Sequence, residues 1–178
     1  MKSKVYIMTK AALIAAIMCV LGPLSLPISI SPVPVSLGVL GIFLGVYAIG
    51  CVWGTVSCLI YILLGLVGLP VFAGFTGGPQ KLLGPTGGYI VGYIFLTLIA
   101  GFFIDRFEKK IPFQILGMVL GTIVLYAFGT AWLAISYKMS FGAALMAGVV
   151  PYIPADAIKM VLAILVGIPL RKALKKLQ

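Results

Sequence analysis

Long apolar stretches without charge dominate the chain, and the longest covers residues 11–80. A helix that crosses a bilayer needs about 20 apolar residues, so this stretch alone has room for roughly three such helices. Proline and glycine divide the apolar stretches into six predicted membrane helices: Thr9–Leu26, Ser36–Gly50, Cys51–Leu66, Gly87–Ile104, Pro112–Ile135 and Pro154–Leu174. The chain has no evident internal repeat, which favours an all-α membrane protein with a single six-helix domain over residues 1–178.

Two segments between the predicted helices are rich in residues that break helices. Ser31–Pro34 alternates proline with other residues, so we expect a stiff extended link, because proline fixes its own φ and restricts the residue before it. Gly68–Gly88 contains seven glycines and three prolines, which exclude a regular helix. Structureless loops of this length are uncommon, and this one is apolar, so we predict that it packs as a lid over the helix ends.

The composition excludes a soluble globular domain. Of 178 residues, 62% are hydrophobic and 9% are charged, whereas soluble domains carry about 25% charged residues. A mean hydropathy of +1.24 indicates an integral membrane protein in a lipid bilayer, and it excludes disorder. The net charge of +10 would ordinarily suggest nucleic-acid binding, but the basic residues occur in short clusters between apolar runs. We therefore expect no nucleic-acid partner.

The basic clusters predict the orientation of the chain in the membrane. Cytoplasmic loops carry an excess of Lys and Arg, and the three clusters are separated by even numbers of predicted helices. Six helices with both termini cytoplasmic satisfy the rule at all three, whereas five helices would place one cluster outside. The Gly-rich segment and Lys138 then lie on the outer side. The clusters are Lys2, Lys4 and Lys10; Arg106, Lys109 and Lys110; and Arg171, Lys172, Lys175 and Lys176.

Apart from the basic clusters at the helix ends, Asp156 and Lys159 are the two charged residues that this assignment places inside a helix. An ionisable group in a membrane segment is costly, so it indicates function by default. The i, i+3 spacing puts both side chains on one helix face. Pro154 suits the first turn of a helix, which places Asp156 near the positive end of the helix dipole. A self-neutralising pair without a ligand is the structural alternative.

Residues around the Gly-rich segment are further candidates for ligand contact. Glycine lets the backbone approach a ligand closely, and Thr86 is placed either to cap the next helix or to face a polar ligand. Tyr89, Tyr93 and Tyr152 flank this segment or the Asp156 motif. They offer apolar walls with a hydroxyl group, although tyrosines at helix ends also form membrane-interface belts.

Small residues in the first predicted helix form two overlapping pairs at i, i+4, Ala11 with Ala15 and Ala12 with Ala16. Such small-xxx-small faces allow close helix–helix approach in lipid. The pattern lies at the predicted cytoplasmic end, where a partner subunit could contact it. Packing inside the chain itself is the alternative.

Motifs for covalent or metal chemistry are missing from the sequence. The chain has no His, no P-loop, and three cysteines without disulfide or metal spacing, so we predict no enzyme, no metal and no cofactor. Lys159 suits a carboxylate, Asp156 suits the N–H groups of a urea or amide, and the apolar surroundings suit a ring or chain. We therefore expect a small amphipathic acid as ligand. The chain looks too small for an autonomous inverted-repeat transporter, which favours delivery to a larger machine.

Four motifs together resemble the BioY family, the biotin-specific S components of energy-coupling factor (ECF) transporters: Gly68–Ala73, Gly84–Tyr89 with Gly92, Pro154–Lys159 and the link Pro32–Leu37. The resemblance covers nearly the whole chain. It implies a six-helix S-component fold in a prokaryotic plasma membrane and capture of extracellular biotin. It also implies assembly with a transmembrane coupling subunit and two ATPases.

The resemblance further implies roles for individual residues. Asp156 and Lys159 would contact biotin, with lid contacts around Gly74, Thr86, Gly88 and Tyr89. The alanine pairs resemble the docking face for the coupling subunit. Some relatives have Asn or Arg before the Gly84–Tyr89 motif, and this chain offers Thr76, Gln80 and Lys81 there instead.

Several alternatives stay open from the sequence. We assign the ureido N–H groups of biotin to Asp156 and the carboxylate to Lys159, although the two positions lie close together for a ligand with widely separated ends. An S component for another small carboxylate vitamin shares the same fold. A proton-coupled carrier or channel is suggested by Thr86–Tyr89, which superficially resembles a potassium filter. A lipid-modifying enzyme is disfavoured by the missing catalytic groups.

Overall fold

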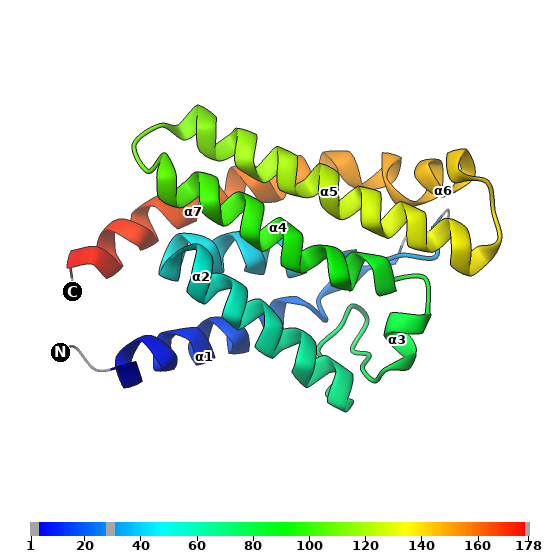
Figure 1. The fold of residues 1–178 in the computed structure, drawn as a ribbon, viewed down its shortest axis with the longest axis horizontal. Helices are drawn as coiled ribbons and strands as arrows, with labels where there is room; N and C mark the ends of the chain where they lie inside the picture. The colour runs from blue at the N-terminus through cyan, green and yellow to red at the C-terminus, as the bar shows by residue number, and fades with distance from the viewer. Residues whose placement is uncertain (1–3, 28–30, 177–178) are drawn as a thin grey trace.

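The computed structural model describes residues 4–27 and 31–176, so Lys2 of the first basic cluster lies outside the described residues. Helices make up most of this part of the chain (Figure 1). The elements in order are α1 (Lys4–Leu21), β1 (Ser25–Leu26), β2 (Val35–Ser36), α2 (Gly38–Val67), α3 (Gln80–Leu83), α4 (Gly87–Arg106), α5 (Ile111–Tyr137), α6 (Phe141–Gly148), the 3₁₀ turn η1 (Val150–Tyr152) and α7 (Ile153–Lys176).

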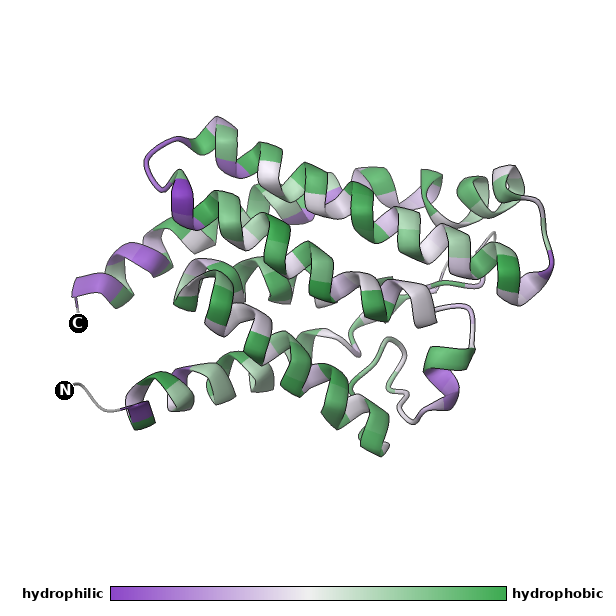
Figure 2. Ribbon diagram, in the orientation of Figure 1, coloured by the Kyte–Doolittle hydropathy of each residue, from purple (hydrophilic) through white to green (hydrophobic). Residues whose placement is uncertain are grey.

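Among the described residues, five helical stretches are long and apolar enough to cross a bilayer: α1, α2, α4, α5 and Phe141–Lys176. Hydrophobic residues run along these helices, and hydrophilic residues gather toward the end that holds both termini (Figure 2). Large apolar side chains such as Val52 and Leu165 are more than half exposed. An apolar exterior of this extent suits lipid rather than water, so the predicted class of helical, multi-pass membrane protein is confirmed.

Helix α2 is broken at Gly50, where φ of 82° and ψ of 178° leave the helical region. Figure 1 shows the two halves running in opposite directions. Val46 and Gly54, on the two sides of the break, are in close contact, since a Cβ on the glycine would lie 3.1 Å from the valine side chain. In a continuous helix these two residues, eight positions apart, would be separated by about 12 Å along the axis. The break coincides with the predicted boundary between the second and third helices, and it reverses the chain.

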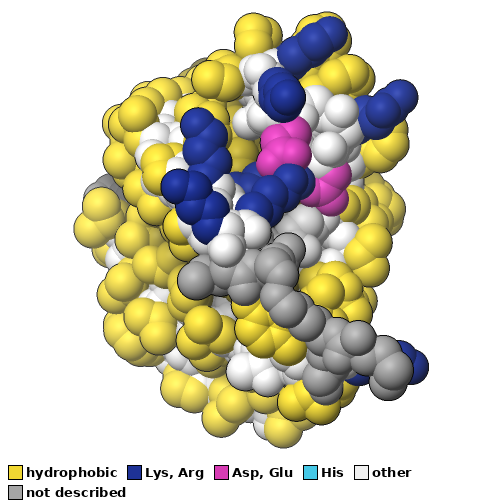
Figure 3. Space-filling model, turned by 90° about the vertical axis from the view of Figure 1, so that its left-hand side faces the viewer, with side chains coloured by type: hydrophobic (Ala, Val, Ile, Leu, Met, Phe, Trp, Pro, Cys, Tyr) yellow, Lys and Arg dark blue, Asp and Glu magenta, His cyan; other side chains and the backbone are white. Residues whose placement is uncertain are grey.

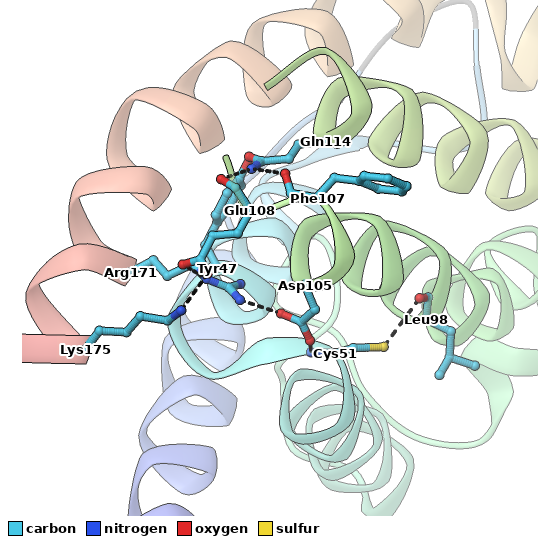
Figure 4. A network of polar contacts seen from close by, with 9 residues as sticks. All are labelled: Tyr47, Cys51, Leu98, Asp105, Phe107, Glu108, Gln114, Arg171 and Lys175. Atoms are coloured by element: carbon cyan, nitrogen blue, oxygen red, sulfur yellow. Dashed lines mark hydrogen bonds and ion pairs between the residues drawn. The ribbon is translucent and has the colours of Figure 1, made fainter. Parts of the chain in front are cut away.

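The end of the bundle with both termini also carries the α4–α5 turn (Figure 1), and basic side chains surround acidic ones there (Figure 3). Arg171 of α7 pairs with Asp105 at 2.8 Å and with Glu108 at 3.1 Å. Lys175 pairs with Glu108 at 2.6 Å, and this hydrogen bond holds the pKa of Glu108 below its ordinary value. Asp105 also accepts the N–H of Cys51 at 2.7 Å (Figure 4). The network therefore ties α7 and the α4–α5 turn to the break in α2.

Helix α1 begins and ends earlier than predicted. It spans Lys4–Leu21 rather than Thr9–Leu26. The helix includes both Lys4 and Lys10, because a lysine near a membrane surface can extend its ammonium away from lipid. Here the ammonium of Lys10 lies 4.3 Å from the centre of the Tyr6 ring. The helix ends just before Gly22 and Pro23.

The chain between α1 and α2 forms a short ribbon instead of a plain extended link. Ser25–Leu26 pairs antiparallel with Val35–Ser36. The predicted Ser31–Pro34 link bends at its centre, since the N–H of Val33 donates to Ser31 Oγ at 3.1 Å. A serine hydroxyl that accepts from the backbone two residues later is a common turn former.

Two short helices were not predicted from the sequence. Helix α3 occupies four residues of the Gly-rich segment, which is otherwise irregular as expected. Helix α6 precedes α7, and the side chain of Ser140 caps it by accepting the N–H of Ala143 at 3.3 Å. Both are too short to be recognised from an apolar pattern that continues on either side.

Candidate functional site

A cavity of about 110 Å³ opens between α4, α5, α7, the β1–β2 link and the lid segment, residues 68–88. It lies toward the end where α4 and α7 begin, opposite the two termini (Figure 1). In the described part of the chain its charged lining residues are Lys81, Asp156 and Lys159, and its aromatic ones are Tyr61, Phe72, Tyr89, Tyr93, Tyr126 and Tyr152. The cavity is therefore an apolar, aromatic chamber with a few charges.

Asp156 and Lys159 lie together on the first turns of α7. Lys159 Nζ donates to Asp156 Oδ1 at 2.7 Å, and each residue is 5% exposed. Buried charges are costly unless they are paired, and the start of a helix favours a carboxylate. The predicted placement on one helix face is confirmed, and the two side chains form one neutral unit in the cavity wall.

Tyr126 of α5 is a site residue that sequence reasoning missed. Its hydroxyl donates to Asp156 Oδ2 at 2.5 Å, so both oxygens of this carboxylate have a donor. The sequence does contain one indication of its role, because Tyr126 lies in the middle of a predicted membrane helix, where an interface belt does not explain a tyrosine. The partner of that tyrosine depends on how α5 packs against α7, which the sequence does not reveal.

Tyr152 joins the β1–β2 link to the start of α7. Its hydroxyl donates to the carbonyl oxygen of Val33 and lies 2.6 Å from Ser31 Oγ. Since Val33 also lines the cavity, these contacts fix one wall of the chamber. The predicted position of Tyr152 beside Asp156 corresponds to a structural tie that shapes the cavity.

Tyr89 and Tyr93 lie on successive turns of α4 and both line the cavity. The hydroxyl of Tyr89 donates to the carbonyl oxygen of Gly148 at 2.7 Å, which holds the end of α6 against α4. The hydroxyl of Tyr93 has no hydrogen-bond partner among the residues that the structure describes. It is therefore the tyrosine with a donor available for a ligand.

The lid folds back onto the bundle through its own backbone. The N–H of Gly78 donates to the carbonyl oxygen of Gly65 at 2.7 Å, and the N–H of Gly74 donates to the carbonyl oxygen of Pro23 at 3.1 Å. Phe72 packs edge-on against Tyr61, with ring centres 5.7 Å apart. The predicted packing of this apolar segment over the helix ends is confirmed.

Polar lid residues divide into those that line the cavity and those that do not. Thr76, Lys81 and Thr86 line it, and Gln80 does not. Thr86 makes no side-chain cap to α4, and its hydroxyl donates instead to the carbonyl oxygen of Lys81 at 3.3 Å. Thr76 likewise donates to Ala73 at 2.9 Å.

The two glycines predicted as ligand contacts lie outside the cavity lining. Gly74 has a φ of 75° and open space around it, so it serves as a turn in the lid. Gly88 packs directly on Phe128 and Trp132 of α5, and a Cβ there would overlap them. Their structural roles are a turn and a close helix crossing.

The alanine pairs of α1 face different surroundings. Ala11 and Ala15 are each 2% exposed, and the carbonyl oxygen of Ala11 accepts the hydroxyl of Ser57 from α2 at 2.8 Å. Ala12 and Ala16 are exposed on the outer face of the helix. Only the second pair is accessible to a partner, because the first pair packs inside the chain.

No group of three metal-binding side chains (His, Cys, Asp or Glu) occurs within the described ranges. Cys19, Cys51 and Cys58 are free thiols. The chemical capacity of the cavity therefore rests on one acid, two amines and several hydroxyls.

Known proteins share both the sequence and the fold of this chain. The profile of the BioY family matches residues 1–176. The biotin transporter BioY of Thermotoga maritima is 37% identical over 163 residues, covering 92% of this chain and 94% of that protein. A probable biotin transporter BioY of Pyrococcus horikoshii is 39% identical over 140 residues, covering 79% and 82%.

A solved structure agrees with these relatives. The crystal structure of the S-component for biotin from an ECF-type ABC transporter superposes with a TM-score of 0.87 and 32% identity, covering 95% of this chain and 92% of that one. Sequence and fold agree over almost the full length, so the chain belongs to the BioY family.

Proposed function

We propose that this chain is the biotin-binding S component of an ECF-type importer, which captures biotin from outside and passes it to an ATP-driven partner. The family membership and the structural relative support this function. The observation that carries it is the buried Asp156–Lys159 pair in an aromatic cavity at the end opposite the termini. Binding and release need no covalent step, so we expect no enzymatic turnover and no cofactor.

The cavity chemistry fits the parts of biotin. Asp156 is a carboxylate that can accept the ureido N–H groups, and the adjacent ammonium of Lys159 can donate to an oxygen of the ligand. Tyr93 offers an additional donor, and the walls formed by Tyr89 and Tyr152 suit the bicyclic ring and the alkyl chain. Backbone and side chains of the lid, including Thr86, close the outer side.

We also propose that the single domain crosses the plasma membrane of a prokaryote six times, with both termini in the cytoplasm. The reversal of α2 at Gly50 supports counting this element as two crossings. The basic end in Figure 3 then faces the cytoplasm, as the positive-inside rule requires. The cavity faces the outside, where biotin would enter.

Uptake against a gradient requires an energy source, and the described residues form no nucleotide-binding loop. We therefore propose that the chain assembles with a transmembrane coupling subunit and two ATPases. The exposed alanines Ala12 and Ala16 on α1 support a close helix–helix contact with the coupling subunit. Docking would then reorient the loaded S component.

Mass spectrometry of small molecules that co-purify with the protein tests the ligand. Biotin is the expected molecule, and another carboxylate vitamin in its place would redirect the assignment within the same fold class. Titration calorimetry with biotin then tests the site. Asp156→Asn should weaken binding strongly, since an amide replaces an acceptor-only group, while Asp105→Asn at the other end should not. Undiminished affinity in Asp156→Asn would remove Asp156 from the site.

A further inference from the structure

Lys81 is a charge in the cavity that the pairing of Asp156 with Lys159 leaves unbalanced. It lies on α3 in the lid, is half-buried, and lines the same chamber. Its ammonium has no hydrogen-bond or ion-pair partner among the residues that the structure describes. The cavity lining therefore carries a net charge of one positive unit.

The electrostatic balance of the loaded cavity depends on this lysine. The ammonium of Lys159 lies 2.7 Å from Asp156, so these two groups cancel. A ligand with one carboxylate would bring a net negative charge into this neutral pair, and uncompensated charge in a low-dielectric site is costly. With Lys81 included, the ammonium groups of Lys81 and Lys159 balance the carboxylates of Asp156 and the ligand, and the loaded cavity is neutral.

Ligand geometry leads to the same residue. The ureido ring and the carboxylate of biotin lie at opposite ends of the molecule, separated by the bicyclic ring and an alkyl chain. Asp156 and Lys159 are in direct contact, so this pair cannot hold both ends of an extended ligand. Lys81 is on a different wall, in the lid rather than on α7.

The backbone holds Lys81 in place at the cavity. Its N–H donates to Gly78 at 3.1 Å, and the N–H of Gly84 closes the other end of α3 by donating to Gln80 at 2.9 Å. The hydroxyl of Thr86 donates to the carbonyl oxygen of Lys81 at 3.3 Å. The side chain therefore extends from a fixed base, which lowers the entropy lost when it contacts a ligand.

From this we infer that Lys81 is the specificity-determining residue for the carboxylate of the ligand, while the Asp156–Lys159 pair holds the opposite end. The inference rests on the proposed biotin function and assigns the recognition of the acid group to the lid. It moves the carboxylate contact from Lys159, where the sequence placed it, to Lys81.

Calorimetric titrations with biotin and with biotinamide, which lacks the negative charge, test the inference. The intact protein should bind biotin more tightly than biotinamide. Lys81→Met and Lys81→Gln should weaken biotin by about 10–100-fold, the value of one charge-assisted hydrogen bond, and should leave biotinamide nearly unchanged. Lys81→Arg should restore most of the preference for biotin. Lys138→Met, at an exposed lysine outside the cavity lining, is the matched control and should change neither affinity.

Two results would overturn the role of Lys81. Equal weakening of both ligands would show that the lysine only shapes the lid, and unchanged affinities would show that Lys159 alone recognises the acid. Absence of biotin binding by the intact protein would be a different outcome, because it would contradict the proposed function itself.

Discussion

Replacing Lys159 by Met should destabilise the protein far more than its size suggests. The change removes one member of a pair whose charged atoms are 2.7 Å apart and whose residues are 5% exposed. At an effective dielectric constant of about 20, the attraction at this distance is about 6 kcal/mol, and desolvation offsets most of it. Loss of one partner from a buried pair costs about 3–5 kcal/mol, because an unpaired charge stays behind.

The assay is thermal unfolding of the detergent-purified protein without ligand. For a chain of this size the expected cost corresponds to a midpoint lowered by roughly 6–20 °C. The double variant Asp156→Asn with Lys159→Met should recover much of this loss, since no buried charge remains. Lys175→Met is the matched control, because its partner Glu108 is 2.6 Å away but both side chains are exposed, and exposed pairs contribute at most about 1 kcal/mol.

The comparison of single and double variants decides whether the reasoning holds. If the double variant were as unstable as Lys159→Met, the loss would come from packing and not from an unpaired charge. If Lys159→Met were no less stable than Lys175→Met, Asp156 would have another source of compensation in the cavity.

Three further predictions concern other parts of the fold. The hydrogen bond from Lys175 lowers the pKa of Glu108 in the folded protein, so the ionised Glu108 stabilises the fold above about pH 4.5. This stabilisation is lost as the pH falls below that value. Glu108→Gln should therefore flatten the acid side of a stability–pH profile. Gly129→Ala should lower stability by about 1–3 kcal/mol and weaken biotin binding, because its Cβ would overlap the Tyr89 ring. Gly142→Ala, in open space on α6, is the control. Ala12→Phe should prevent the coupling subunit from co-purifying with this chain and should leave biotin affinity unchanged. Intact assembly would show that the exposed alanine face of α1 is not the docking surface.

The helices and their order could be predicted because membrane helices follow simple rules of length and charge. The boundary after Gly50 was recognisable from the sequence because that residue is followed by a second apolar run. Helix α1 was predicted too late because its start was set by the beginning of the charge-free stretch at residue 11, whereas the helix already begins at Lys4. The ribbon and α6 were missed because their short hydrogen-bonded pieces leave no periodic pattern.

Part of the cavity was predictable for a different reason. A charge inside an apolar run is visible in any sequence, so Asp156 and Lys159 were identified directly. Tyr126 was not, because its contact with Asp156 joins two helices that are distant in the chain. Gly74 and Gly88 do not line the cavity because of what their backbones lie against, open space for Gly74 and helix α5 for Gly88. Only the packed structure provides this information.

The i, i+3 spacing of Asp156 and Lys159 also bears on how the chain enters the membrane during synthesis. A single unpaired charge costs up to about 2.5–3.5 kcal/mol on insertion, the value for the centre of a membrane helix. Because both charges belong to α7, the pair can form as soon as that helix forms, before any other segment is in position. The translocation machinery then receives a nearly neutral segment. A carboxylate on one helix and an ammonium on another would each have to wait, unpaired in lipid, for the bundle to assemble.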